Sequence, residues 1–189
     1  QQFYFDKLER KLLRKELNFR ERDNVFISVG ALTKRKNHIG AIKFLQKNVM
    51  NFKYIIIGRE GDYKEEVQKE VGLDINIKLI PYVKNDELYK YYSASDYFIM
   101  PSSQEGQSLV CLEAFACGLP VLINKKIIDT LGVTEEFNNY YSEIDLDLNT
   151  EVKYEKLKYE FRMDLSRHSK NNLKWEIIAK RYSEYYNKL

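Results

Sequence analysis

Residues 96–124 read D-Y-F-I-M-P-S-S-Q-E-G-Q-S-L-V-C-L-E-A-F-A-C-G-L-P-V-L-I-N, and this stretch decides the fold. Tyr97–Met100 is a short apolar run rich in strand-forming residues, and a turn of Pro, Ser, Gln and Gly follows it. Ser108–Cys117 predicts a helix capped by its first residue, and Gly118 suits the positive φ of a helix end. A second apolar run covers Val121–Ile123. The stretch therefore predicts a strand, a loop, a helix and a second strand.

The expected helix carries a single acid among apolar residues. From Leu109 to Cys117 every residue except Glu113 is apolar, so most of the helix circumference is expected to be covered. A covered carboxylate is costly unless hydrogen-bond donors surround it. Glu113 is therefore either paired within the fold, with a lysine as the plainest partner, or held for a ligand.

Strands and helices alternate on the N-terminal side of this stretch. Further strands are expected at 25–29, 54–57 and 77–80, and helices at about 38–48, 62–71 and 85–94. The second of these helices is expected to open with a capping box of Asp62 and Glu65. Such alternation favours a parallel sheet with helices on both faces. The predicted fold class is α/β, a Rossmann-like three-layer sandwich with a parallel sheet.

The two ends of the chain are less regular. Residues 6–17 predict a helix with one apolar stripe, formed by Leu8, Leu12, Leu13 and Leu17. After Asn124 the periodicity is lost, and two helices are expected at about 151–163 and 173–188.

Composition limits the class of protein. The chain has 189 residues, 44% of them hydrophobic, which suits one compact domain. The net charge of +3 comes from interspersed acids and bases, so nothing demands nucleic acid as a partner. No run approaches the roughly 18 apolar residues of a membrane span. Cys111 and Cys117 are about 9 Å apart along the expected helix, too far for a disulfide, and fit a cytoplasmic location.

Two loops are expected to bind a phosphate-bearing ligand. In a 3-2-1-4-5 strand order, 30–37 and 102–108 follow neighbouring strands at the point where the order reverses, and each loop leads into a helix N-terminus. Arg35 and Lys36 add positive charge there, whereas Lys34 fits a solvated turn. The dinucleotide fingerprint G-x-G-x-x-G and the P-loop G-K-[ST] are both absent. Carboxylates in and after the second loop would accept hydrogen bonds from sugar hydroxyls.

At this point the sequence resembles a known family. The run P-S-x-x-E-G-x-S-L-V-x-L-E-A-F-A-C-G-L-P-V-L, with Glu105 and Glu113 as an E-x7-E pair, resembles retaining GT-B glycosyltransferases of the family 4 type (glycosyl transferases group 1). S-V-G-A-L-T-K-R-K-N-H resembles their first phosphate-binding loop. D-E-L-Y-K-Y-Y-S-A-S-D resembles the helix before their E-x7-E strand, and K-W-E-I-I-A-K-R-Y-S-E-Y-Y their closing helix. The resemblance covers the chain from about Asn24 onward.

The resemblance implies the C-terminal, donor-binding half of such an enzyme. Glu113 would accept hydrogen bonds from the ribose of a nucleotide diphosphate-sugar, and the catalytic pair would be Glu105, facing the transferred sugar, and Lys36, neutralising the diphosphate. Further donor-binding residues would be Gly30, Arg35, Gly106, Gln107, Ser108, Leu109 and Val83, with Val83 near the base. Transfer of the hexose would retain the anomeric configuration and need neither a cofactor nor a metal.

The resemblance also implies a missing partner domain. The chain begins with Gln and is expected to be part of a longer protein, with 1–23 as a helix and link and 24–189 as the nucleotide-sugar-binding domain. The N-terminal domain would carry the acceptor site and a catalytic histidine, so the isolated chain should transfer little. Three departures from the family pattern are Ala31, where arginine is usual, Gln107, where an aromatic is usual, and 124–129, which lacks a glycine-rich turn.

Other readings of the sequence stay open. One is a non-catalytic sugar-nucleotide-binding module, another an anion- or nucleic-acid-binding domain that uses the basic loop and the tyrosines, and a third a sugar-nucleotide epimerase on the same scaffold. Of these, nucleic acid is not the expected partner. The helix around Trp175 is expected to dock on its own domain, with peripheral contact to the inner membrane surface as the alternative. His38 is expected to be a helix-start residue and His168 a surface residue, neither at metal-ligand spacing.

Overall fold

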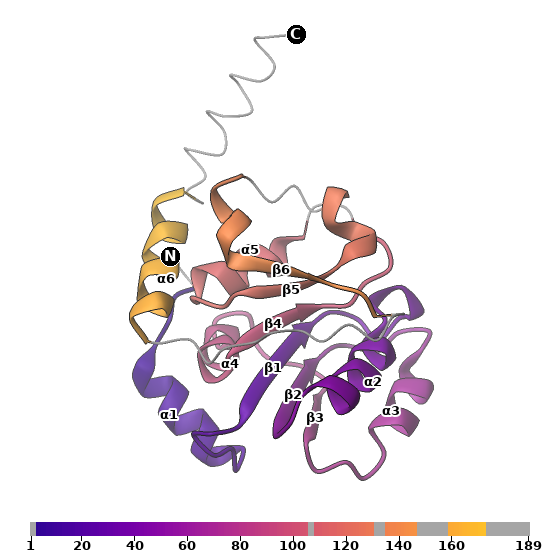
Figure 1. The fold of residues 1–189 in the computed structure, drawn as a ribbon. Coiled ribbons are helices and arrows are strands. Elements are labelled where there is room, and N and C mark those ends of the chain that lie inside the picture. The colour runs from indigo at the N-terminus through magenta and orange to yellow at the C-terminus, as the bar shows by residue number, and fades with distance from the viewer. Residues whose placement is uncertain (1–2, 106–107, 131–134, 147–158, 173–189) are drawn as a thin grey trace, which may run out of the picture.

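The computed structural model describes residues 3–105, 108–130, 135–146 and 159–172. Within these ranges the chain forms a six-stranded sheet in the order β3-β2-β1-β4-β5-β6, with all neighbouring strands parallel (Figure 1). The strands are β1 (Asn24–Val29), β2 (Phe52–Ile57), β3 (Ile77–Ile80), β4 (Tyr97–Met100), β5 (Val121–Asn124) and β6 (Tyr141–Ile144). The order reverses between β1 and β4, as the sequence predicted.

Helices cover both faces of this sheet. The described helices are α1 (Lys7–Glu16), α2 (His38–Asn48), α3 (Lys64–Val71), α4 (Leu88–Ala94), α5 (Leu109–Ala116) and α6 (Tyr159–Asn172). One buried core lies between the sheet and α2 with α3, and the other between the sheet and α4, α5 and α6. Short 3-10 turns follow β1, at Lys34–Lys36, and β5, at Lys125–Thr130, and a third, Glu135–Tyr140, precedes β6. The predicted Rossmann-like three-layer sandwich is therefore confirmed, with a sixth strand that the sequence analysis missed.

Several predicted element boundaries need correction. The capping box of Asp62 and Glu65 is wrong, because α3 starts after Tyr63 without a side-chain cap. The helix expected at 151–163 is observed as α6, which extends to Asn172, and residues 151–158 lie outside the described part of the chain. The helix expected at 173–188, with Trp175, also lies outside it.

The apolar stripe predicted for α1 is only partly correct, because Leu13 is buried and Leu17 packs against the core but the other two leucines face solvent. Leu8 and Leu12 are 66% and 53% exposed, whereas Arg10 and Arg14 are buried. The reason lies in α4, whose last carbonyl groups have no partner within the helix and need donors. An arginine side chain has five N–H groups that can donate to these carbonyls, whereas a leucine side chain has no donor.

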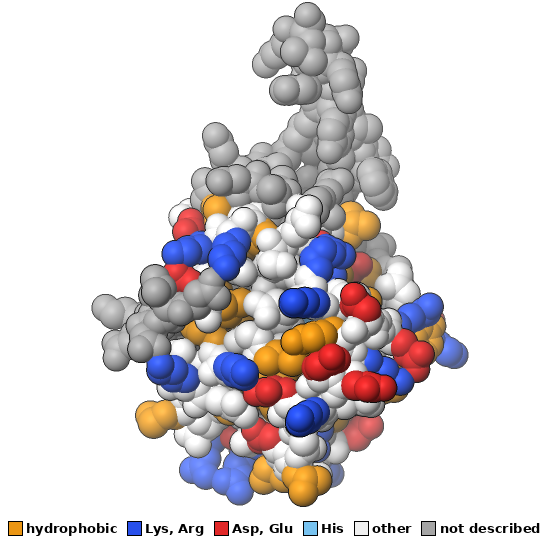
Figure 2. Space-filling view, turned by 90° about the vertical axis from the view of Figure 1, so that its right-hand side faces the viewer, with side chains coloured by type: hydrophobic (Ala, Val, Ile, Leu, Met, Phe, Trp, Pro, Cys, Tyr) orange, Lys and Arg blue, Asp and Glu red, His pale blue; other side chains and the backbone are white. Residues whose placement is uncertain are grey.

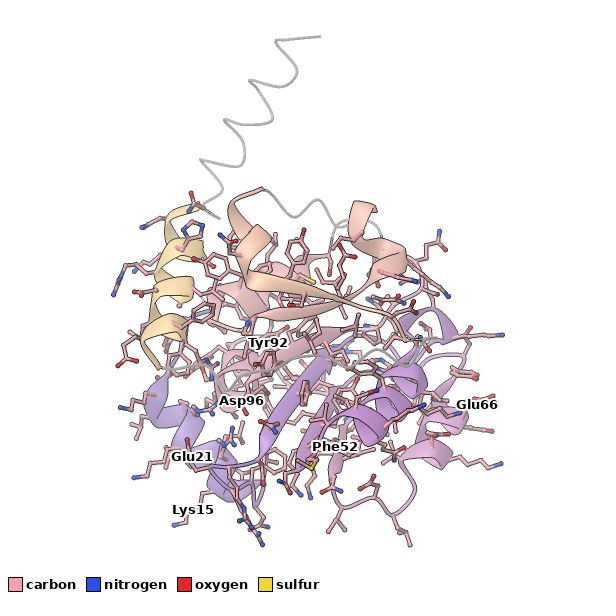
Figure 3. The ribbon with its side chains drawn as sticks, in the orientation of Figure 1. Lys15, Glu21, Phe52, Glu66, Tyr92 and Asp96 are labelled. Carbon is pink, nitrogen blue, oxygen red and sulfur yellow. The ribbon has the colours of Figure 1, made fainter. Side chains whose placement is uncertain are left out.

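Three buried arginines, Arg10, Arg14 and Arg162, form a cluster that we call the arginine clamp. Arg10 and Arg14 pair with Asp96 at 2.6 and 3.2 Å. Arg162 comes from α6 and lies over the ring of Phe5 at 4.1 Å. The clamp donates hydrogen bonds to the main-chain carbonyls of Tyr92, Ser93, Ala94, Ser95, Cys117 and Gly118, among others. It therefore ties α1 and α6 to the end of α4, beside the labelled Asp96 in Figure 3.

Candidate functional site

The loops after β1 and β4 lie side by side. Strands β1 and β4 pair directly, with Phe26 opposite Tyr97 and Ile27 opposite Phe98, so their carboxyl ends meet at one edge of the sheet. Ligands of open α/β sheets bind at this edge, where the strand order reverses. The position is the one predicted from the sequence.

The two loops are joined by the side chains proposed for catalysis. Lys36 Nζ donates to Glu105 Oε1 at 2.7 Å, and Arg35 Nη1 lies 3.2 Å from the same oxygen. Arg35 also donates to the carbonyl of Gln104 at 2.8 Å, and the N–H of Ser103 donates to the carbonyl of Arg35 at 2.9 Å. The Arg35 side chain is 48% exposed, against 15% for Lys36 and 8% for Glu105, so the shielded Lys36 pair is the stronger link.

Glu105 is held as a carboxylate. Burial by itself would raise the pKa of Glu105, but the hydrogen bond from Lys36 and the charges of Lys36 and Arg35 bring it below the usual value. An ionised acid and an ammonium group are therefore both present at the sheet edge at neutral pH.

Local backbone geometry places Lys36 at this position. Thr33 caps the 3-10 turn by accepting from the N–H of Lys36, and Asn37 ends the turn in the left-handed conformation at φ 50°. The stem of Lys36 then lies against Gly30, because a Cβ at Gly30 would lie 3.0 Å from Lys36 Cε. Gly58 is constrained more strongly, since a Cβ there would overlap the carbonyl oxygen of Gly30. The glycine at the end of β1 thus leaves room for the cation.

A chain of buried hydrogen bonds anchors the loop after β1. Tyr54 Oη lies 2.7 Å from Ser28 Oγ, Ser28 Oγ lies 3.1 Å from His38 Nδ1, and His38 Nε2 lies 3.3 Å from the carbonyl oxygen of Ala31. Burial lowers the pKa of His38 to about 4, so the ring is neutral at physiological pH. Neutral His38 donates from Nε2 to Ala31 and accepts at Nδ1. The predicted position of His38 at a helix start is confirmed. Its hydrogen bonds to Ser28 and Ala31 were not predicted.

A signal for this network was present in the sequence. Ser28 interrupts the apolar run of β1, and a buried hydroxyl needs a partner. The second histidine, His168, is half-buried against Phe137 and Tyr140 and is not a fully exposed surface residue.

Glu113 lies on α5 with a buried partner. Its Oε2 accepts a hydrogen bond from Tyr92 Oη at 2.9 Å, and its side chain is half-buried. Burial raises the pKa of Glu113, and the bond from Tyr92 partly offsets the rise. The lysine partner considered as the plain alternative is wrong.

The start of α5 carries the remaining second-loop residues. Ser108 stands at the N-cap position, but its hydroxyl makes no capping bond and instead lies 4.0 Å from the sulfur of Met100, so the predicted cap is wrong. Leu109 is 59% exposed at the first helical position. Gly106 and Gln107 lie outside the described residues.

A cleft of about 340 Å³ opens at the carboxyl ends of β1, β2 and β3. Gly30 and Val83 both line it, so two predicted donor-binding residues share one space. Arg59 and Tyr82, which the sequence analysis did not select, line it too, with the guanidinium 4.8 Å from the ring centroid. The walls are mostly apolar, which suits a flat ring.

A larger cleft, of about 450 Å³, lies elsewhere. It is lined by residues 17–20 and 23 and by side chains at the amino ends of β2 and β3, such as Lys53 and Lys78. Because ligand crevices in open α/β sheets lie at carboxyl ends, the smaller cleft beside Gly30 is the better candidate.

Two further properties of the described residues concern metal binding and membrane crossing. No group of three His, Cys, Asp or Glu side chains with metal-binding geometry occurs among them. No described helix has the length and apolar character to cross a bilayer. On the face shown in Figure 2, basic and acidic side chains alternate and form no continuous basic track among the coloured atoms.

The fold and the site together define a Rossmann-like α/β protein with an ion pair joining two loops where the strand order reverses and a cleft at the carboxyl ends of β1, β2 and β3. Comparison with known proteins gives the family. The family described as Glycosyl transferases group 1 matches residues 9–142, and the chain belongs to it.

Three similar proteins illustrate the range of the family. A galactosyltransferase of Escherichia coli, named UDP-Gal:alpha-D-GlcNAc-diphosphoundecaprenol alpha-1,3-galactosyltransferase, is 28% identical over 144 residues, which is 72% of this chain and 37% of that protein. The structure of Anabaena HepE in complex with UDP matches with a TM-score of 0.73 and 16% identity, over 100% of this chain and 55% of HepE. The C-terminal domain of LpcC, a glycosyl transferase group 1 family protein of Francisella tularensis, matches with a TM-score of 0.61 and 20% identity, over 95% of each chain. The chain spans well under half the length of the curated relatives it matches.

Proposed function

We propose that this chain is the donor-binding, C-terminal domain of a retaining glycosyltransferase and holds a nucleotide diphosphate-sugar for transfer of a hexose. The observation that carries the proposal is the contact of Lys36 with Glu105, which brings a cation and an acid together between the two ligand-ready loops. The cation can neutralise the charge of a diphosphate, and the acid can accept hydrogen bonds from the hydroxyl groups of a sugar ring.

Each part of the donor has a matching place in the crevice. The diphosphate would lie by Lys36 and the N–H groups at the start of α5, which Ser108 leaves without a side-chain cap. Glu105 would accept from hydroxyls of the transferred sugar, and Glu113 from the ribose. The base would enter the cleft beside Val83. Lys36 would then stabilise the charge that develops on the leaving diphosphate.

The relatives support the rest of the proposal. HepE binds UDP, and the E. coli relative is named for a UDP-galactose donor and a lipid-linked acceptor. The solved LpcC domain is a C-terminal domain of nearly the same extent as this chain. We therefore propose that an N-terminal domain supplies the acceptor site, with a glycan or lipid as acceptor, and that the isolated chain binds donor and transfers little.

Calorimetric titration with UDP-, GDP- and ADP-sugars, and with the three free diphosphates, tests this function. Glu113→Ala should weaken the preferred free diphosphate about tenfold through the lost ribose bonds. Glu105→Ala should weaken the diphosphate-sugar more than the free diphosphate. Glu66→Ala, an exposed site on α3, is the matched control and should change neither. Absence of binding by the wild-type chain to every compound would refute the proposal.

A second candidate is a non-catalytic sugar-nucleotide-binding module, and Ala31 favours it. Arginine is usual at this position, and Arg35 is already engaged with Glu105 and Gln104. The full-length protein separates the two functions, because a binding module would hold the donor without releasing nucleotide diphosphate or a glycosylated product.

A further inference from the structure

Tyr92 stands behind the site and contacts Glu113 directly. It lies on α4, is fully buried, and donates from Oη to Glu113 Oε2 at 2.9 Å. Its ring packs against Phe3 and Phe98, with centroids 6.0 Å away in each case. Figure 3 labels it in the interior of the molecule. The phenol is therefore a donor fixed by packing on both sides.

The main chain of Tyr92 is fixed as well. Arg162 of the arginine clamp donates from Nη2 to the carbonyl of Tyr92 at 3.2 Å. The same guanidinium reaches the carbonyls of Ser93 and Ser95 through Nη1, at 3.2 and 2.7 Å. The end of α4 is thus held from α6, so the Tyr92 hydroxyl has little freedom to follow a moving carboxylate. Glu113 must adopt the orientation that this hydroxyl dictates.

The hydrogen bond from Tyr92 opposes the effect of burial on the pKa of Glu113. Burial raises the pKa of Tyr92 well above its usual value, and the charge of Glu113 raises it further, so the phenol stays protonated. Burial also raises the pKa of Glu113, and the bond from Tyr92 acts in the opposite direction. A neutral glutamic acid would lose part of its capacity to accept hydrogen bonds. The bond from the phenol therefore opposes protonation of Glu113.

We propose that Tyr92 is the positioning residue for Glu113: its buried hydroxyl orients the carboxylate so that it can receive two hydroxyl groups of the ligand. This inference rests on the proposed role of Glu113 in nucleotide binding. It assigns a function to a tyrosine that would otherwise count as a core residue.

Tyr92→Phe removes the hydroxyl and keeps the ring. With the tightest binder among UDP, GDP and ADP as the probe, the dissociation constant at pH 7.5 should rise about five- to tenfold. The pH at which affinity falls on acidification should rise, because Glu113 loses the hydrogen bond that lowers its pKa. Phosphate titration of the probe affects wild type and variant equally, so the difference reports on the protein. Tyr97→Phe, a buried tyrosine in the core on the other face of the sheet, is the matched control and should leave both quantities unchanged.

A double-mutant cycle separates positioning from a general structural effect. In a Glu113→Ala background, Tyr92→Phe should change the dissociation constant less than twofold, because the side chain that accepts the Tyr92 hydrogen bond is gone. Thermal unfolding of each variant monitors the fold. Two results would overturn the role of Tyr92 while leaving the proposed function intact, provided that the wild type binds normally. One is that the affinity losses of the two single variants are additive, and the other is that the pH at which affinity falls is the same in Tyr92→Phe as in the wild type. A wild-type chain that binds none of the three diphosphates would overturn the proposed function and this inference together.

Discussion

Lys36 Nζ and Glu105 Oε1 are 2.7 Å apart although 69 positions separate the two residues in the sequence. The contact joins the loops after β1 and β4. An entering diphosphate would attract Lys36 as strongly as Glu105 does, so donor binding is expected to exchange or share this ion pair.

Lys36→Met should weaken binding of the preferred nucleotide diphosphate about ten- to a hundredfold, because a charge-assisted contact to phosphate is lost. Titration calorimetry at two salt concentrations measures this change. Lys34→Met, on an exposed lysine of the same turn, is the control. An equal loss in the two variants would mean that the turn contributes only diffuse charge.

Gly30→Ala should reduce nucleotide affinity, because the new methyl group would meet the flexible stem of Lys36 and displace its ammonium group. It should also destabilise the fold, because Gly30 has a φ of 159°, which residues with a Cβ rarely adopt. Gly58→Ala should destabilise the fold by about 1–3 kcal/mol without meeting Lys36, because its methyl group would overlap the main-chain carbonyl of Gly30. Urea unfolding combined with nucleotide titration distinguishes the two, and a normal affinity in Gly30→Ala would remove the link to Lys36.

His38 should make the fold sensitive to acid. The pKa of His38 is about 4 in the fold and about 6.5 in an unfolded chain, so the unfolded state binds more protons between these values. The stability that neutral His38 contributes to the fold is fully present above pH 6.5. It is lost as the pH falls toward 4, and the free energy of unfolding then decreases by about 3 kcal/mol in total. Urea unfolding at pH 7.5 and pH 4.5 measures the loss. His38→Gln should have a shallower pH dependence, and an unchanged slope would contradict the burial argument.

Arg162→Met should be among the most destabilising substitutions in the chain, by about 3–5 kcal/mol, because five buried carbonyls would each lose one hydrogen bond. Arg167→Met, on the exposed side of the same helix, should have a much smaller effect. Thermal unfolding compares the two. Similar losses would show that the arginine clamp is not a structural anchor.

Sequence patterns predicted the helices and strands whose limits follow from local apolar periodicity. The limits of α2, β3 and β4 agree with the predicted ranges because their apolar periodicity is strong and turn residues flank them. The meeting of Lys36 with Glu105 followed from topology, since neighbouring parallel strands bring their loops together.

Other features depended on tertiary contacts that no local pattern reports. The inward turn of Arg10 in α1 follows from the carbonyl groups of α4, far along the chain. Strand β6 was missed because only Ile144 of its four residues is buried, so its apolar signal is weak. A lysine was the alternative partner considered for Glu113, whereas the fold supplies the phenol of Tyr92.

Amide NMR of the labelled chain, titrated with the tightest binder among UDP, GDP and ADP, tests the central claim most directly. We predict that the largest shift changes fall on Gly30, Lys36, Leu109 and Val83, which surround the crevice at the carboxyl ends of the strands. Changes concentrated at Lys53 and Lys78, in the larger cleft at the opposite ends, with Lys36 unaffected, would contradict the account.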